Sequence, residues 1–304
     1  MPPSPTYHQP VLLRESIEAL GVRPEGVYAD LTFGGGGHSM AILERIKGGR
    51  LIAFDQDGEA AEVARRILSN SFLFIEANFR HFDRFLKANR ISVLDGIIAD
   101  LGVSSHQIDT PERGFSTRFI GKLDMRMSAE NSRNAASILS KYSEEELQRV
   151  FSEYGEVHNA RTLARTLTAR ARTAPLKTTG DLIEVLRPLA IRGRENKYYA
   201  KVFQALRIEV NDELGALREM LALSASMLKP GGRLVVISYH SLEDRQVKKF
   251  MNTGKFEGGV EKDFYGNVLR PMRPLFGKPV TPGEDERARN PRSRSARMRA
   301  AEKI

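Results

Sequence analysis

Four consecutive glycines, Gly34 to Gly37, separate two segments of different periodicity. Residues 27–31 form a short apolar run that predicts a strand, and the apolar residues of 40–46 follow the spacing of a helix. In α/β proteins, a strand, a glycine turn and a helix in this order bring backbone N–H groups up to a nucleotide-like ligand. Glycine suits such a turn because it adopts positive φ and has no Cβ to keep a ligand away. We therefore predict an α/β fold with a ligand-binding loop at residues 34–37.

Short apolar runs and helical patterns alternate through the first hundred residues. Together with a later run, the predicted strands are 27–31, 50–54, 72–75, 96–99 and 233–238. Alternation at this spacing predicts a doubly wound, mostly parallel sheet of the Rossmann-like kind. Helices cover both faces of such a sheet, which suits apolar runs without polar alternation.

The alternation stops after Asp100, and residues 101–193 show only polar loops and amphipathic helical patterns. A long helix is predicted from about Tyr198 to Met227, before the last strand. We therefore expect a core interrupted by an all-helical insertion. The expected boundaries are 1–103 for the first part of the core, 104–195 for the insertion and 196–304 for the second part of the core.

Composition limits the setting and the partners. The chain has 304 residues, a formal net charge of +9 and no cysteine. The absence of cysteine excludes disulfides, thiolate zinc sites and cysteine nucleophiles, and a reducing cytoplasm is the simplest location. No apolar run approaches the ~18 residues of a transmembrane helix, and the first ten residues do not form a secretory signal. The positive charge favours a polyanionic partner, most simply nucleic acid.

Arginine is concentrated near the C-terminus. Residues 287–299 contain six arginines and no acidic residue, among them Arg292 and Arg294. We expect a tail of little regular structure, which would neutralise RNA phosphates if it lies near the ligand.

Three chemistries compete for the glycine loop. A phosphate-binding P-loop needs Gly-Lys-Ser/Thr, whereas Gly37 is followed by His38. A dinucleotide loop needs a third glycine where Ser39 stands. S-adenosylmethionine has no pyrophosphate and needs only close backbone approach, and Asp55 at the end of the second strand is placed to accept the hydroxyls of its ribose. The same carboxylate would serve NAD equally well, so it indicates an adenosine ribose and no more.

Polar residues stand at the carboxyl ends of several predicted strands. They are Asp30, Asp55, Asp100 and the segment 238–240. Ligands of open α/β sheets bind beyond these strand ends, so we expect the four positions to border one crevice, the active site.

Several longer motifs occur in a fixed order and resemble one family. The motifs are LTFGGGGHS at 31–39, DLGVSS at 100–105, RGFS at 113–116, LDMRM at 123–127, FQALRI at 203–208, ISYHSLEDR at 237–245 and NPRSRS at 290–295. With these motifs, the chain resembles the bacterial small-subunit ribosomal RNA cytosine-N4 methyltransferases (the RsmH, or MraW, family) over nearly its whole length.

The resemblance implies a fold, a cofactor and a substrate. It implies a methyltransferase core with an inserted helical domain for substrate recognition, and a cytidine in the decoding centre of 16S rRNA, within the small ribosomal subunit, as substrate. S-adenosyl-L-methionine is the implied cofactor. Its implied contacts are Gly36, Gly37, His38, Asp55, Phe79, Asp100 and Gln107.

The lack of cysteine agrees with an amine acceptor, because methylation of cytosine C5 usually needs a cysteine thiolate. An exocyclic amine attacks the sulfonium methyl directly once it is held in line. We hypothesise that Asp100 accepts a hydrogen bond from N4 and assists loss of its proton.

Further residues are candidates for contact with the substrate or for structural roles. Ser241 and Asp244 fit the cap of a helix. We expect no metal site, since His38 has no second ligand at a suitable spacing. The substrate candidates are Phe115, Tyr239, His240, Arg292 and Arg294, with Phe33 and His8 as further possibilities.

Two other functions are compatible with the residues alone. An NAD-dependent oxidoreductase would share the ribose carboxylate, and binding of NAD against S-adenosylmethionine separates the two. A non-catalytic RNA-binding or ribosome-assembly factor could retain the fold without transferring a methyl group. Monomer and homodimer both remain open.

Overall fold

The computed structural model describes residues 10–304. Its sheet has seven strands in the order β3-β2-β1-β4-β5-β7-β6. β1 to β5 are parallel to one another, and β7 is antiparallel to both β5 and β6. This confirms the predicted Rossmann-like class. The strands are β1 (Val27–Asp30), β2 (Arg50–Asp55), β3 (Phe72–Glu76), β4 (Leu94–Asp100), β5 (Leu228–Ser238), β6 (Met272–Pro274) and β7 (Arg297–Lys303).

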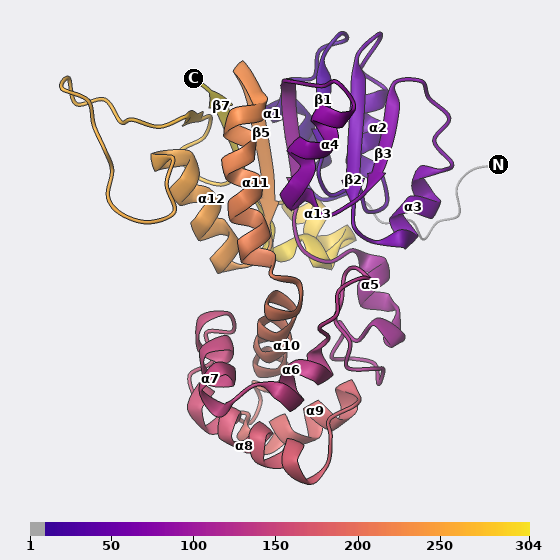
Figure 1. Cartoon of the computed structure of the whole chain (residues 1–304), viewed down its shortest axis with the longest axis vertical. Helices are drawn as coiled ribbons and strands as arrows, with labels where there is room; N and C mark the ends of the chain where they lie inside the picture. Colours follow the sequence, from indigo (N-terminus) through magenta and orange to yellow (C-terminus); the bar gives the residue numbers. More distant parts are fainter. Residues whose placement is uncertain (1–9) are drawn as a thin grey trace. The chain divides into compact units, whose positions relative to one another are not determined.

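Helices cover both faces of this sheet (Figure 1). Successive strand residues point to opposite faces. In β4, Ile97 packs in the cluster that includes α4, α11 and α12, and Ile98 packs in the cluster that includes α1 and α2. The helices of this unit are α1 (Leu13–Leu20), α2 (Gly37–Leu43), α3 (Gly58–Ala64), α4 (Phe82–Ala88), α11 (Glu213–Met227), α12 (Ser241–Thr253) and α13 (Glu284–Arg289), with short 3₁₀ turns η1 (Phe79–His81) and η4 (Pro291–Ser295).

The second compact unit comprises Val103–Leu214 and is helical. Its core is a separate apolar cluster. The helix beginning after Ser143 has the capping box that Ser143 and Glu146 suggest in the sequence. The helices are α5 (Ser105–Asp109), α6 (Ala135–Lys141), α7 (Glu144–Glu153), α8 (Ala160–Thr173), α9 (Thr179–Leu186) and α10 (Glu195–Asn211), with the 3₁₀ turns η2 (Pro111–Arg113) and η3 (Arg187–Leu189).

The second boundary of this unit differs from the expected residue 195. Val202, Phe203 and Leu206 of α10 are buried in the helical cluster, so α10 belongs to the helical unit. The single helix expected over 198–227 is two helices, because Asp212 adopts the left-handed conformation (φ 48°) between them. Apolar periodicity continues on both sides of Asp212, so the periodicity alone does not indicate that the helix is interrupted there.

The C-terminal segment also differs from expectation. Instead of a tail of little regular structure, Arg297–Lys303 forms β7, an internal strand between β5 and β6. Met298, Ala300 and Ala301 are buried, while Arg297 stays exposed. The strand is difficult to predict from the sequence because it is rich in arginine and alanine, and neither residue type favours strands by propensity. Among residues 10–304, no helix is both long and apolar enough to span a membrane.

Candidate active site

The order of the strands reverses direction between β1 and β4. From β1 the chain proceeds outward through β2 and β3 and then returns to pair β4 on the other side of β1. In open α/β sheets, this reversal of direction is where ligands bind, beyond the carboxyl ends of the strands. Asp30, Asp55 and Asp100 are the last residues of β1, β2 and β4, and Ser238 ends β5. The structure therefore places all these polar strand ends along one edge of the sheet.

The glycine loop is tied to the neighbouring strands by hydrogen bonds. The Gly34 N–H donates to Asp55 Oδ2 (2.8 Å), and the Asp57 N–H donates to Asp55 Oδ1 (3.0 Å). The Asp100 N–H donates to the Thr32 hydroxyl (2.6 Å). The loop between β1 and α2 is thus held by the ends of β2 and β4, which gives it a defined position at the crevice.

Different physical causes require glycine at different positions of this loop. Gly36 adopts φ +78°, and a Cβ there would lie 2.8 Å from the Phe33 ring. A Cβ on Gly37 would lie 2.7 Å from the ring of Pro10. A Cβ on Gly34 would meet no atom closer than 4.0 Å, although its φ of +51° still favours glycine. Close packing inside the protein therefore explains Gly36 and Gly37, and Gly34 is the position that leaves open space.

Replacing Gly36 by Ala is expected to lower the free energy of unfolding by about 2–5 kcal/mol. Left-handed backbone strain accounts for about 1–2 kcal/mol and overpacking against Phe33 for about 1–3 kcal/mol. Gly231→Ala is the matched control, because Gly231 has a similar φ of +76° and no atom within 4 Å of its Cβ position. Urea unfolding measures both variants, and equal losses would show that the Phe33 contact is unimportant.

Asp30 is buried, and Asp55 and Asp100 are partly buried, with little compensating positive charge around them. Burial raises the pKa of Asp30 to about 6, against hydrogen bonds from the Ser39 hydroxyl (2.7 Å) and the Thr32 N–H (3.1 Å). Burial likewise raises the pKa of Asp55 to about 6, and the nearby Asp30 adds to it. Carboxylates with raised pKa values in a crevice favour a ligand that carries positive charge.

Asp100 is the most perturbed of the three. Burial raises the pKa of Asp100 to about 7, although the Tyr239 hydroxyl donates a hydrogen bond to its Oδ1 (2.8 Å). Its other oxygen, Oδ2, lies 3.9 Å from His38 Nδ1. Burial and the adjacent Asp100 raise the pKa of Tyr239 well above its ordinary value, so its hydroxyl remains a donor. Asp100 therefore keeps one oxygen fixed by Tyr239 and titrates near neutral pH.

Three of the predicted contact residues, Phe33, Tyr239 and His38, have partners within the protein. Phe33 is 3% exposed and its ring packs against Phe72 and Phe74. Tyr239 uses its hydroxyl on Asp100, as described above. His38 is buried, with Nε2 3.1 Å from the Val11 carbonyl oxygen.

The expected cap of α12 is wrong in its residues. His240, not Ser241, is the N-cap: its Nδ1 accepts from the Glu243 N–H (3.4 Å), and Glu243 Oε2 accepts from the Tyr239 N–H (2.9 Å). Asp244 instead binds two arginines of β7, Arg299 and Arg297. Sequence reasoning missed these pairs because they join positions more than fifty residues apart.

The remaining predicted residues fall in different places. Phe79 begins η1 after β3, half-buried against the sheet core, and the preceding Asn78 donates to Gln56 Oε1 (2.8 Å), next to Asp55. Gln107 and Phe115 belong to the helical unit, where Gln107 completes the capping box of α5. Arg292 and Arg294 lie in η4, half-buried and exposed respectively. His8 lies outside the described residues.

Two hydroxyls flanking the glycines were not predicted as part of the site. Thr32 accepts the Asp100 N–H, and Ser39 donates to Asp30. Both fix strand-end carboxylates or their backbone, so they shape the crevice. The only signal in the sequence is that each is separated by one residue from an end of the glycine run.

Comparisons with known proteins identify the family of this chain. The model of the MraW methylase family matches residues 5–304. A ribosomal RNA small subunit methyltransferase H from Cytophaga hutchinsonii is 54% identical over 98% of this chain and 99% of its own length. A protein of the same name from Amoebophilus asiaticus is 54% identical over 99% and 97%. A solved structure of a putative methyltransferase from Streptococcus mutans in complex with SAH is 12% identical, with a TM-score of 0.42, over 98% of this chain and the whole of its own. Because the family model and these relatives cover almost the entire sequence, the chain belongs to the MraW methylase family.

Proposed function

We propose that this protein uses S-adenosylmethionine to methylate the exocyclic N4 amine of a cytidine in the 16S RNA of the small ribosomal subunit. The observation that carries the proposal is the set of three carboxylates with raised pKa values, Asp30, Asp55 and Asp100, around a strand–glycine–helix loop. Their uncompensated charge suits a sulfonium cofactor better than the anionic phosphates of NAD. The names of the relatives support small-subunit ribosomal RNA as the substrate.

The residues of the crevice fit this cofactor. Asp55 would accept the ribose hydroxyls, since each carboxylate oxygen has lone pairs beyond the one used by Gly34 or Asp57. Gly34 leaves space for close approach, and Phe79 stands after β3 for the adenine. The cofactor supplies an activated methyl group on its sulfur. The chain itself supplies binding, orientation and a proton acceptor.

Asp100 is the residue we assign to proton transfer. Tyr239 fixes its Oδ1, and the other oxygen, Oδ2, would accept a hydrogen bond from the N4 amine of the target base. Accepting this bond aims the nitrogen lone pair, and the carboxylate then takes the proton that the methylated amine loses. No covalent intermediate with the protein is needed.

Labelled S-adenosylmethionine tests the proposal. The protein is given tritium-labelled cofactor with small subunits that lack the modification and, separately, with naked 16S RNA, and the RNA is digested to nucleosides. We expect label in N4-methylcytidine, with assembled subunits as the better substrate. Label in no nucleoside would leave an RNA-binding or assembly role, and tighter binding of NAD than of S-adenosylmethionine would favour an oxidoreductase.

Asp55→Asn is expected to weaken binding of S-adenosylmethionine by about 10- to 100-fold. Asparagine has one acceptor oxygen where aspartate has two, so one ribose hydroxyl would lose its acceptor on binding, and leaving a buried donor unpaired costs about 1–3 kcal/mol. Asp83→Asn is the control, since Asp83 is also largely buried but pairs with Lys87 on α4. Isothermal titration calorimetry measures both, and unchanged affinity of the Asp55 variant would remove the ribose role.

A further inference from the structure

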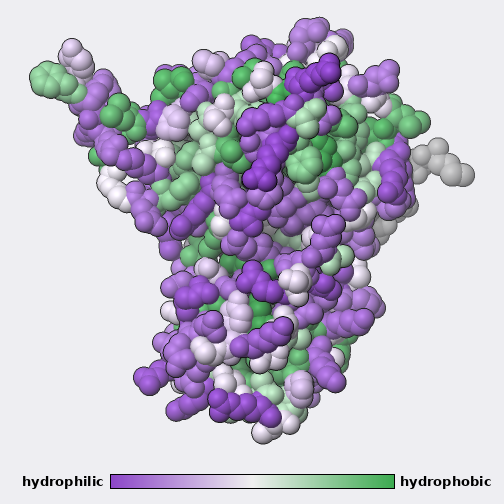
Figure 2. Space-filling model, viewed as in Figure 1, coloured by the Kyte–Doolittle hydropathy of each residue, from purple (hydrophilic) through white to green (hydrophobic). Residues whose placement is uncertain are grey.

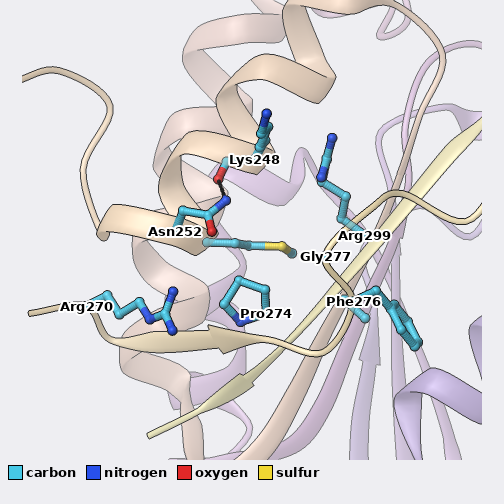
Figure 3. Close-up of a pocket in the computed structure, with 9 residues that line it drawn as sticks. Lys248, Asn252, Arg270, Pro274, Phe276, Gly277 and Arg299 are labelled. Carbon is cyan, nitrogen blue, oxygen red and sulfur yellow. Dashed lines mark hydrogen bonds between the residues drawn. The ribbon is translucent and has the colours of Figure 1, made fainter. Parts of the chain in front are cut away.

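A hollow lies toward the β7–β6 edge of the sheet unit, away from the strand ends of β1 and β2. It has a volume of about 190 Å³ and is formed by α12, β6, β7 and the segments joining them. In the sheet order, β7 and β6 form the edge beyond β5, whereas Asp30 and Asp55 end β1 and β2. Figure 3 shows Lys248 and Asn252 on α12, with Arg299 on β7 across from them and Arg270 at the mouth.

This hollow, which we call the basic pocket, carries excess positive charge. Arg299 is neutralised by Asp244, with Nε 2.6 Å from Oδ1. Lys248 and Arg270 have no acidic partner within the described part of the chain. About 190 Å³ is several times the ~30 Å³ that one water occupies in the liquid, so a solvated phosphodiester fits.

An aromatic-tipped loop begins and ends beside the pocket. Residues 254–271 follow α12, end next to Arg270 and project away from the sheet unit (Figure 1). At the tip, Phe264 is 98% and Tyr265 is 86% exposed, and the tip carries hydrophobic surface among hydrophilic residues (Figure 2). Two adjacent exposed rings on a projecting loop are typical of an interaction site.

The tip is an ordered turn. Asp263 accepts hydrogen bonds from the backbone N–H groups of Tyr265 (2.9 Å) and Asn267 (2.8 Å), and from the Asn267 side chain (2.9 Å). Gly266 allows the turn with φ +87°. Below it, Lys262 pairs with Val268. The rings are therefore held outward by the backbone.

We propose that the 254–271 loop and the basic pocket together form a second RNA-binding surface, outside the methyl-transfer crevice. Unpaired bases stack on Phe264 and Tyr265, and a phosphate farther along the same strand lies between Lys248 and Arg270. Rings with basic residues at their base suit single-stranded RNA, because every base offers a flat face and every nucleotide a negative charge. The inference rests on the proposed RNA substrate and assigns a different part of the protein to holding it.

Two double variants of the full-length protein test this surface. Lys248→Glu/Arg270→Glu removes the phosphate contacts, and Phe264→Ser/Tyr265→Ser removes the stacking platform. Filter binding to a 16S RNA transcript is measured over a series of salt concentrations. The charge variant is expected to lower the magnitude of the slope of log affinity against log salt by ~0.7 per lost phosphate contact. The aromatic variant is expected to bind roughly five- to 150-fold more weakly per lost base without a change in slope.

Matched controls lie at the opposite edge of the sheet unit. Arg66→Glu changes charge at an exposed residue after α3, and Leu68→Ser removes a side chain that is 95% exposed. Both controls are expected to bind RNA like the wild type. All variants are expected to bind S-adenosylmethionine normally, since none alters the crevice.

Two results would overturn the proposal. In the first, both double variants bind RNA with the affinity and the salt slope of the wild type, while the wild-type protein still methylates RNA. That result would contradict the second surface and leave the proposed function intact. In the second, the double variants bind RNA normally but lose self-association in sedimentation, or lose binding to a purified ribosomal protein. That result would assign the surface to a protein partner. Failure of the wild type to label RNA counts against the proposed function instead.

Discussion

Methyl transfer to RNA by an Asp100→Asn variant is expected to fall by about 10²- to 10⁴-fold, the usual contribution of a positioned proton acceptor. Asparagine preserves the size of the side chain and can still accept the hydrogen bond from Tyr239. It cannot take a proton from the N4 amine. Single-turnover labelling with saturating cofactor and RNA measures the chemical step, and calorimetry measures cofactor affinity separately.

The pH dependence gives an independent test of Asp100. Its pKa is about 7, raised by burial, so the ionised and active fraction grows as pH rises through about 7. The single-turnover rate should therefore rise through that range and level off above it. The Asp100→Asn variant should lack this rise.

Tyr239→Phe should move the rise to higher pH. The Tyr239 hydroxyl donates to the Asp100 carboxylate and so stabilises its charged form. Losing a hydrogen bond to a charged group, worth about 1.5–3 kcal/mol, raises the midpoint by about 1–2 pH units. Tyr265→Phe, at an exposed ring, is the control. For Asp100 itself, normal turnover and normal cofactor affinity in the Asp100→Asn variant would contradict its assigned role as proton acceptor.

Asp244→Ala is expected to destabilise the protein by about 3 kcal/mol, which is typical when one partner of a largely buried ion pair is removed. Asp244 and Arg299 are 9% and 12% exposed, and their two hydrogen bonds attach α12 to β7. The variant leaves Arg299 charged without its partner. The free energy of urea-induced unfolding at pH 7 measures the loss.

The same carboxylate makes a pH-dependent contribution to stability. Burial alone would raise the pKa of Asp244, but Arg299 and Arg297 outweigh it and lower the pKa below its ordinary value. A lowered pKa stabilises the folded state above the unfolded-state value near 4 and less as pH falls below it. Wild type and Asp244→Ala should therefore converge in acid. Replacing both partners, Asp244→Leu with Arg299→Met, should recover much of the loss, and a double variant as unstable as Asp244→Ala would contradict this account.

Local patterns in the sequence were enough to predict the parallel core. The strand before Gly34, the helix after Gly37 and the strand ends at Asp55 and Asp100 depend on short-range periodicity and on glycine's backbone freedom. Burial of both faces makes the strands continuously apolar, so they are easy to recognise. The order of the strand ends along one edge then follows from the right-handed parallel connections of α/β folds.

Tertiary structure alone decided the features that join distant segments. Arg297–Lys303 becomes a strand because β5 and β6 offer open edges, and Asp244 neutralises its arginines. Helix α10 belongs to the helical unit because of what its buried residues contact. Tyr239 and Asp100 meet only because β4 and β5 are neighbours in the sheet. Periodicity reports which face of an element is buried, whereas these outcomes depend on the partner that buries it, and no short stretch of sequence contains that information.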